Sequence, residues 1–378
     1  MRNKSLWKLI THSLDSSLVK RENRKGEEIY WKNFKYLWLV ITVLTFTLSI
    51  PFVYAQGSKP LQICATVPDL GSLAQEIGGD QVKITVFAKS QEDAHFVEAK
   101  PSFIKALSQA DLYIQIGMEL EVGYAPVLLQ NARNSRVLPG AQGFLDASKV
   151  IIPLEVPTGA IDRSMGDVHP QGNPHYLLDP LNGLLVARLI KGKLIELRPE
   201  KGSFFEERYT ILYRRIGEGL VGEKLSRKYD FEKLAVLFDE KKLVPFLKDQ
   251  KEDALLGGWL GMMLPYQGSK VVTDHTMWPY FARRFGISLA GFLEPKPRIS
   301  PTTKHLQALI EMMKAEGIQV ILSSPYYDIR HAQFVSRNTG AKIVPMAHQV
   351  GSRPGTDNYF SMTDYNVRQV VAGFSGTN

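Results

Sequence analysis

The sequence is poor in the residues that several common protein classes require. A single cysteine, Cys64, among 378 residues excludes an internal disulfide and a cysteine-rich metal site. No His-Glu-x-x-His helix or comparably compact catalytic motif is present. Beyond residue 55 there is no basic stripe interleaved with aromatic residues, so nucleic acid is not an expected partner.

The basic character of the chain lies mostly in its first 55 residues. A basic stretch precedes the apolar run Leu37–Ile50, and Pro51 and the small-residue site ending at Ala55 follow. This order is typical of an export signal, so we expect residues 1–55 to be a cleaved signal peptide. The alternative is a retained membrane anchor, because apolar character extends from Tyr36 to Tyr54. Without the nine basic and four acidic residues of this segment, the net charge falls from +8 to +3.

Cys64 lies in Leu61-Gln62-Ile63-Cys64, which superficially resembles a lipoprotein cleavage box. Ile63 is bulky for the residue before a cleaved bond, and the apolar run has ended well before it. We therefore expect Cys64 to be a small buried residue of the first strand.

The remaining 323 residues exceed the size at which a single core keeps growing, which favours two domains. Strand-like runs alternate with helical patterns in two series, which predicts an α/β fold of two lobes, each a mostly parallel β-sheet flanked by helices. A long rigid helix is expected to join them. We expect an N-terminal lobe over 56–198, a linking helix with a charged insertion over 199–268, and a C-terminal lobe over 269–378.

Individual elements follow from these patterns. The expected strands are 61–67, 82–87, 111–117, 270–273, 288–293, 320–323 and 342–345. The expected helices are 70–77, 101–110, 277–285, 302–316 and 329–339, with a long helix after Pro199 and a second amphipathic segment between 219 and 255.

Four widely spaced residues are candidate metal ligands: His95, His175, His275 and Asp357. Each lies in a short turn-like stretch beside a strand-like run. Binding residues gather beyond the carboxyl ends of strands in open α/β sheets, and the loops of His95 and His275 should lie there. Three imidazole nitrogens and one carboxylate oxygen suit tetrahedral zinc and close it without leaving room for a substrate. The set therefore indicates capture of a metal ion rather than catalysis.

Three neighbours compete for these roles. His169 could be a further metal contact, but two prolines separate it from His175, which favours a place behind the ligands or at the surface. Asp179 before Pro180 is typical of a helix cap. Asp274 is the rival of His275, and neighbouring residues of an extended strand face opposite sides. His348 is assigned only a surface or core role.

The four segments together resemble the zinc- and manganese-binding solute receptors of bacterial ABC importers. The resemblance runs from about Leu61 to Phe374. Its four motifs are Asp93-Ala94-His95-Phe96 through Lys100-Pro101-Ser102, Gly172-Asn173-Pro174-His175-Tyr176 through Asp179-Pro180, Thr273-Asp274-His275, and Asp357 followed by Tyr359-Phe360-Ser361-Met362. It implies that His95 and His175 come from the first lobe and His275 and Asp357 from the second.

The resemblance also implies what the protein does. We expect a monomeric extracytoplasmic or periplasmic receptor that captures a divalent transition metal and delivers it to an ABC permease of the inner membrane, which works with a cytoplasmic ATPase. Zn²⁺, as the transported ligand, is the first choice, and Mn²⁺ remains open because the histidine-rich mobile loop of many zinc receptors is missing. A zinc-dependent hydrolase is the alternative from another class, and an adhesin is a further one.

Overall fold

The computed structural model describes residues 32, 59–159, 169–295 and 299–376. The expected signal peptide, 1–55, lies almost wholly outside the described residues. Residues 60–378 form one compact unit, and the fold of that unit follows here. In the described part of the chain, no helix is long and apolar enough to cross a membrane.

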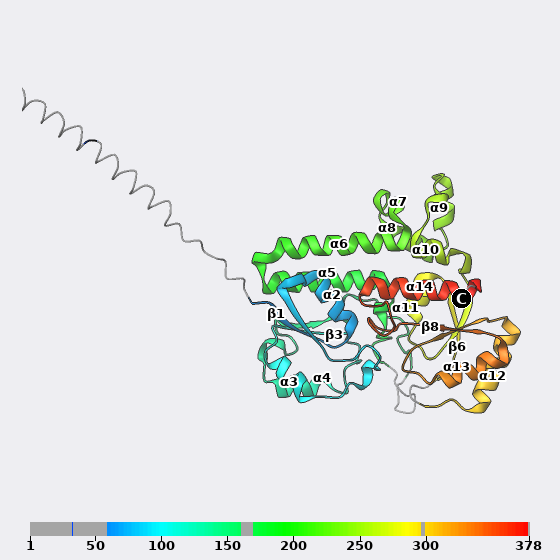
Figure 1. Cartoon of the computed structure of the whole chain (residues 1–378), viewed down its shortest axis with the longest axis horizontal. Coiled ribbons are helices and arrows are strands. Elements are labelled where there is room, and N and C mark those ends of the chain that lie inside the picture. The colour runs from blue at the N-terminus through cyan, green and yellow to red at the C-terminus, as the bar shows by residue number, and fades with distance from the viewer. Residues whose placement is uncertain (1–31, 33–58, 160–168, 296–298, 377–378) are drawn as a thin grey trace, which may run out of the picture. The chain divides into compact units, whose positions relative to one another are not determined.

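The unit contains two parallel sheets of four strands, coloured from blue to cyan and from yellow to orange in Figure 1. The first has the order β2-β1-β3-β4, and the second repeats it as β6-β5-β7-β8. The strands of the first sheet are β1 (Leu61–Ala65), β2 (Val82–Val86), β3 (Leu112–Gln115) and β4 (Phe144–Asp146). Those of the second are β5 (Lys270–Thr273), β6 (Ser288–Phe292), β7 (Val320–Ser323) and β8 (Lys342–Pro345). The two-lobed α/β fold predicted from the sequence is therefore confirmed.

Helices connect the parallel strands, as parallel pairing requires. In the first lobe these are α2 (Pro68–Gly78), α3 (Pro101–Ser108) and α4 (Ala125–Ala132). In the second they are α11 (Pro279–Phe285), α12 (Thr303–Glu316) and α13 (Ile329–Thr339). Cys64 is buried in the middle of β1, as expected for a strand residue. Its neighbours Ile63 and Ala65 are buried as well, so both faces of the strand are covered by helices.

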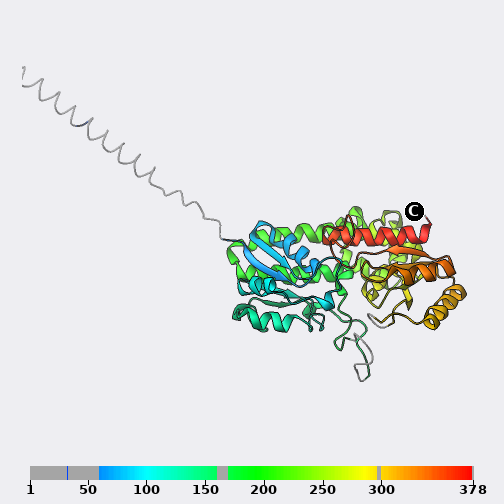
Figure 2. The same cartoon turned by 60° about the horizontal axis from the view of Figure 1, so that its bottom comes forward.

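A layer of three long helices and one short one joins the lobes. It contains α5 (Pro180–Leu197), α6 (Gly202–Val221), α10 (Gly258–Met263) and the last helix, α14 (Tyr359–Ser375). Helix α6 packs on α5 and α2, whereas α10 and α14 pack on its other end, and Figures 1 and 2 show α14 beside α6. The larger buried cluster runs from β1 through these helices to α14. The lobes therefore share a core, which makes their connection stiff.

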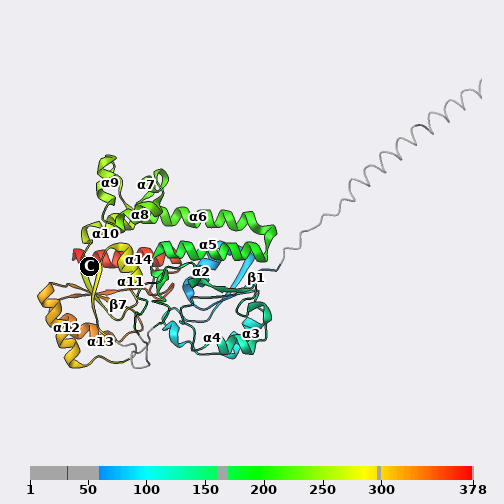
Figure 3. The same cartoon turned by 180° about the vertical axis from the view of Figure 1, so that it is seen from behind.

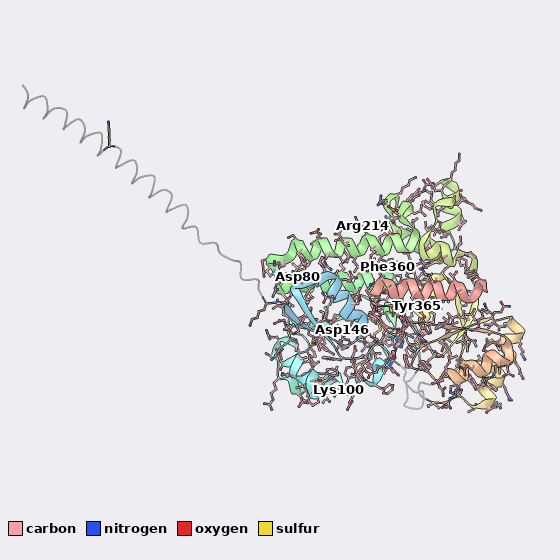
Figure 4. All side chains as sticks on the ribbon, viewed as in Figure 1. Asp80, Lys100, Asp146, Arg214, Phe360 and Tyr365 are labelled. Carbon is pink, nitrogen blue, oxygen red and sulfur yellow. The ribbon has the colours of Figure 1, made fainter. Side chains whose placement is uncertain are left out.

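Phe360 shows how the layer is tied together. Its ring lies 5.1 Å from that of Trp259 on α10, and the Arg215 guanidinium of α6 stands 4.9 Å above it. Figure 4 labels Phe360 on the side of α14 that looks toward α6. The aromatic side chain of α14 thus contacts two other elements of the layer, α10 and α6, at once.

The charged segment after α6 folds into short helices. These are α7 (Glu223–Lys228), α8 (Phe231–Asp239) and α9 (Leu243–Asp249). Lys241, between the last two, has a φ of 58°, a left-handed conformation that ends the α8 helix. Figures 1 and 3 show α7 and α9 projecting from the helical layer on the side away from the sheets. We call residues 219–255 the charged excursion.

Glu121 is a buried carboxyl beside the carboxyl ends of β1 and β3. It is 2% exposed and accepts hydrogen bonds from Thr66 Oγ1 at 2.7 Å and from the backbone N–H groups of Ile116 and Gly117 at 2.7 and 3.1 Å. Burial raises the pKa of Glu121 to about 7, even though these three donors favour the ionised form.

This carboxyl should give the protein a measurable pH dependence. Because its pKa is raised above the ordinary 4.5, folding binds a proton between that value and about 7. Its contribution to stability is complete below about pH 4.5 and is lost as the pH rises through about 7. The unfolding free energy should therefore fall with pH across this window, and Glu121→Gln should reduce the slope of that fall by at most about 1.4 kcal/mol per pH unit.

Urea unfolding of the metal-free protein at several pH values measures the difference. Glu119→Gln, at an exposed residue of the same loop, serves as the control and should keep the slope of the unchanged protein. Equal slopes for Glu121→Gln and the unchanged protein would show that Glu121 is ionised in the folded state throughout the window.

Candidate metal centre

His95 lies in a short 3-10 helix, η2 (Ala94–Phe96), in the connection that follows β2. Asp93 caps this helix by accepting from the backbone N–H of His95 at 3.1 Å, and it also lies 2.7 Å from His95 Nδ1. A carboxylate accepts hydrogen bonds, so Nδ1 carries the proton and Nε2 carries the lone pair of the neutral ring. A carboxylate behind an imidazole is the usual partner of a metal-binding histidine.

His169 faces His95. The two Nε2 atoms lie 3.0 Å apart, and the ring centroids are 5.0 Å apart. Two nitrogens bound to one tetrahedral zinc at about 2.05 Å are separated by about 3.3 Å. The pair therefore has nearly the spacing of two ligands of one ion. The sequence placed His169 behind the ligands or at the surface, and the structure brings it to His95 instead.

His175 precedes a second 3-10 helix, η6 (Tyr176–Leu178), which leads into α5. Its backbone N–H donates to Asn173 Oδ1 at 2.9 Å, and its ring meets that of His95 edge-on at 5.5 Å. Removal from water lowers the pKa of His175 well below its usual value, and four further histidines act in the same direction: His95, His169, His275 and His348. Four histidines therefore lie near enough to act on the charge of His175, and its ring is neutral at neutral pH.

His275 is the second residue after β5, at the carboxyl end of a central strand. Its Nδ1 lies 2.9 Å from the backbone carbonyl oxygen of Glu294, so Nδ1 donates and the lone pair of the neutral ring is on Nε2. The rival ligand, Asp274, is buried and accepts a hydrogen bond from the backbone N–H of Ser324. Burial raises the pKa of Asp274 to about 7. Its carboxyl thus serves the link between β5 and β7.

His348 follows β8 and is 7% exposed. Its Nε2 lies 3.2 Å from the carbonyl oxygen of Glu92 in the first lobe, which fixes the proton on Nε2 and leaves the lone pair on Nδ1. Among the described residues, no hydrogen-bond partner reaches this buried Nδ1. Burial lowers the pKa of His348 to about 4. The ring is neutral, and the lone pair on its Nδ1 is not engaged in a hydrogen bond with any described residue. A metal ion requires such a lone pair from a histidine ligand.

A small cavity of about 40 Å³ connects His348 with the first lobe. Its lining includes Asp69, Asp93, His175 and His348. Asp69 Oδ1 and Gln349 Oε1 are also buried without a hydrogen-bond partner among the described residues. Unsatisfied polar atoms gathered around one cavity mark a place for a bound polar species, an ion or a water.

Asp357, the fourth ligand predicted from the sequence, lies elsewhere. Its side chain is exposed and lines a different pocket, together with Ser72, Lys89, Arg208 and Asn358. Among the residues that the structure describes, no histidine lines that pocket. The structure thus brings together His95, His175 and His275 but does not bring Asp357 to them.

The histidines are close but not yet arranged around a point. Within the ranges that the structure describes, no three histidine, cysteine or carboxylate side chains lie close enough to hold one metal ion. An ion would have to draw the rings together, with His95, His169 and His175 supplied by the first lobe and His275 and His348 by the second. The sequence does carry a signal that would make His348 a candidate, because it follows a predicted strand just as His275 does.

The chain matches known proteins over most of its length. The family model described as zinc-uptake complex component A, periplasmic (ZnuA), matches residues 63–218 and 261–373. The metal ABC transporter substrate-binding lipoprotein SloC of Streptococcus mutans is 23% identical over 323 residues, covering 84% of this chain and 92% of that protein. The manganese ABC transporter substrate-binding lipoprotein PsaA of Streptococcus anginosus is 23% identical over 326 residues, covering 85% and 91%.

A solved structure agrees with these matches. The crystal structure of ZnuA superposes with a TM-score of 0.61 at 19% identity, covering 83% of this chain and 99% of that one. The family model leaves out residues 219–260, which contain α7, α8 and α9. With this fold, the clustered histidines and the match over both lobes, the chain belongs to the ZnuA family, whose members are metal-binding solute receptors of ABC transporters and not enzymes.

Proposed function

We propose that this protein captures Zn²⁺ between its two lobes and delivers it to an ABC permease served by a cytoplasmic ATPase. It works outside the cytoplasm, as the lipoprotein and periplasmic relatives do, after export by the segment 1–55, and it acts as a monomer. The observation that carries the proposal is the gathering of histidines near His175: the His95 and His169 Nε2 atoms lie 3.0 Å apart, the His95 ring meets that of His175 at 5.5 Å, and His175 lines a cavity with His348 of the second lobe. An ion held by both lobes favours the form in which the lobes are closed.

His95, His175 and His275 are the proposed ligands that agree with the sequence prediction. For the fourth position we favour His348 over Asp357, because His348 has a buried Nδ1 without a hydrogen-bond partner among the described residues and lines a cavity with His175, whereas Asp357 lines a separate pocket. His169 is placed to contribute in the metal-free form by pairing with His95. Asp93, behind His95, supplies negative charge near an otherwise neutral ligand set.

This ligand set favours zinc. Imidazole suits zinc, whereas manganese prefers carboxylate, carbonyl and water oxygens. With His348 in the fourth position, all four protein ligands are nitrogens. Manganese is the alternative within the family, because a relative such as PsaA of S. anginosus is named for it. A site using Asp357 would raise the oxygen content and weaken the preference.

Direct titration tests the proposal. Protein stripped by a chelator should take up one equivalent of Zn²⁺ and should bind Mn²⁺ much more weakly in competition. Most nitrogen sites bind zinc more tightly than manganese. Tight zinc binding alone is therefore weak evidence, and both the stoichiometry and the ratio of the two affinities are needed. Failure of the re-loaded protein to bind any divalent metal would refute the proposed function, and tighter binding of Mn²⁺ would refute the choice of metal.

Two alanine variants decide the fourth ligand. We expect His348→Ala to weaken Zn²⁺ binding by more than about tenfold, because even residues behind a metal's ligands are worth about 10- to 100-fold. Asp357→Ala is expected to change the affinity less than about twofold, since its side chain is exposed beside a different pocket. Competition with a coloured chelator measures both. The opposite ranking would return the fourth position to Asp357.

A further inference from the structure

A buried ion-pair cluster links the charged excursion to both lobes. At its centre is Arg284 of α11, which is 4% exposed. Its Nε and Nη2 atoms donate to the two oxygens of Asp179 at 2.9 and 3.0 Å. Its Nη1 donates to both oxygens of Asp239 at 3.0 and 3.1 Å. One guanidinium thus holds two carboxylates from segments that lie far apart in the sequence.

Each partner stands close to a proposed metal ligand or to the excursion. Asp179 is fully buried, lies four residues after His175 and caps α5 by accepting from the backbone N–H of Leu181 at 2.9 Å. Arg284 belongs to the helix that follows His275. Asp239 is the last residue of α8, inside the excursion. The cluster therefore connects the His175 segment, the His275 segment and residues 219–255.

Further bonds make the connection between the two histidine segments stiff. Tyr280 Oη, on the same helix as Arg284, donates to the carbonyl oxygen of Asn173 at 3.0 Å, and Asn173 Nδ2 donates to the carbonyl oxygen of Thr276. The η6 turn between His175 and Asp179 is itself buried. A change at Arg284 would therefore be passed on to His175 through a short, well-packed segment.

Stability alone does not account for this arrangement. Burying charges costs desolvation free energy, and packed apolar side chains of similar volume often stabilise a fold as well or better. What a planar guanidinium with Asp179 on its Nε–Nη2 edge and Asp239 on its Nη1 supplies is a fixed mutual orientation of the two carboxylates. The segments oriented here are the ones that carry ligands from opposite lobes.

We propose that Arg284 is a positioning residue of the metal centre, and that through Asp239 the charged excursion sets how closely the His175 and His275 segments are held around the ion. This inference rests on the proposed metal-binding function. It assigns a role to the excursion, the stretch that the family model leaves unmatched. Two substitutions test this role. Arg284→Lys keeps the positive charge but loses the planar set of N–H donors, and Asp239→Asn keeps the shape of the side chain but loses its negative charge.

Co²⁺ loading gives a readout of ligand geometry that a merely structural role would not change. We expect Arg284→Lys to alter the visible absorption of the bound Co²⁺ and to speed its loss to a chelator about tenfold, and Asp239→Asn to speed it about threefold. Arg283→Met is the matched control: its side chain is 41% exposed, stands 3.8 Å from Asp179 and should leave both readouts unchanged.

The outcomes separate the two proposals. If the unchanged protein binds no Co²⁺, the proposed function fails. If it binds Co²⁺ and the Arg284 and Asp239 variants unfold at lower temperature but keep its spectrum and release rate, the cluster only stabilises the fold and the inference is refuted. Asp239 is partly exposed at its side chain, so Asp239→Asn should fold and decides the question even if Arg284→Lys does not.

Discussion

Alanine in place of His175 is expected to lower the affinity for Zn²⁺ by at least about 100-fold. The ring of His175 meets that of His95 at 5.5 Å and lines a cavity with His348, and burial together with four neighbouring histidines keeps it neutral and able to bind. Residues that merely orient a ligand are worth about 10- to 100-fold, so losing a ligand should cost more.

Isothermal titration of chelator-stripped protein measures this loss. His305→Ala is the matched histidine control, because His305 belongs to α12, its Nε2 pairs with the carbonyl oxygen of Phe292, and it is not among the histidines that lower the pKa of His175. The control should bind like the unchanged protein, and the metal-free form of His175→Ala should unfold like it. Retention of full affinity by His175→Ala would place the ion elsewhere.

Asp179→Ala should cause the largest loss of stability among the changes discussed. The alanine removes the cap of α5, worth about 1 kcal/mol, and leaves the buried Arg284 with half of its charged partners. Breaking a buried ion pair from one side costs about 3–5 kcal/mol. In a protein of this size the unfolding temperature should fall by roughly 10 °C.

Asp230→Ala separates the two contributions. Asp230 caps α8 by accepting from the backbone N–H of Glu232 at 3.0 Å, but its side chain is 46% exposed and it binds no buried arginine. This control should lose only the cap, about 1 kcal/mol. Thermal unfolding of both metal-free variants provides the comparison. Equal losses would mean that the contact between Asp179 and Arg284 adds nothing to stability.

Much of the fold could be predicted because its signals are local. The expected strands 270–273, 320–323 and 342–345 have the bounds of β5, β7 and β8, since buried apolar runs bounded by turns are clear in the sequence. The strand β4 was missed because three residues carry too little pattern. The amphipathic segment of the excursion was expected as one piece, but the left-handed Lys241 divides it.

The site was harder to predict because its ligands are distant in the sequence. His95, His175 and His275 were proposed from their places beside strands and turns, and they stay proposed ligands. His348 was passed over although it follows β8, because Asp357 lay in a matching motif and offered the expected carboxylate. The choice between His348 and Asp357 depended on which of the two side chains the loop between β8 and α14 buries. Burial of His348 Nδ1 and exposure of Asp357 are tertiary properties that no local pattern encodes.

The domain bounds 56–198, 199–268 and 269–378 stay predictions of the sequence. The two sheets fall within the first and third ranges, whereas the larger buried cluster runs through all three. A shared core of this kind limits how far the lobes can move apart, because large hydrophobic interfaces oppose relative domain motion.

Anomalous scattering from zinc-loaded crystals, recorded on both sides of the zinc absorption edge, tests the central claim most directly. We predict one strong peak between the lobes, with nitrogen atoms of His95, His175, His275 and His348 at about 2.0–2.1 Å from it. A peak beside Asp357 in the pocket lined by Ser72 and Arg208, or none within reach of His175, would contradict a metal centre formed by histidines from both lobes.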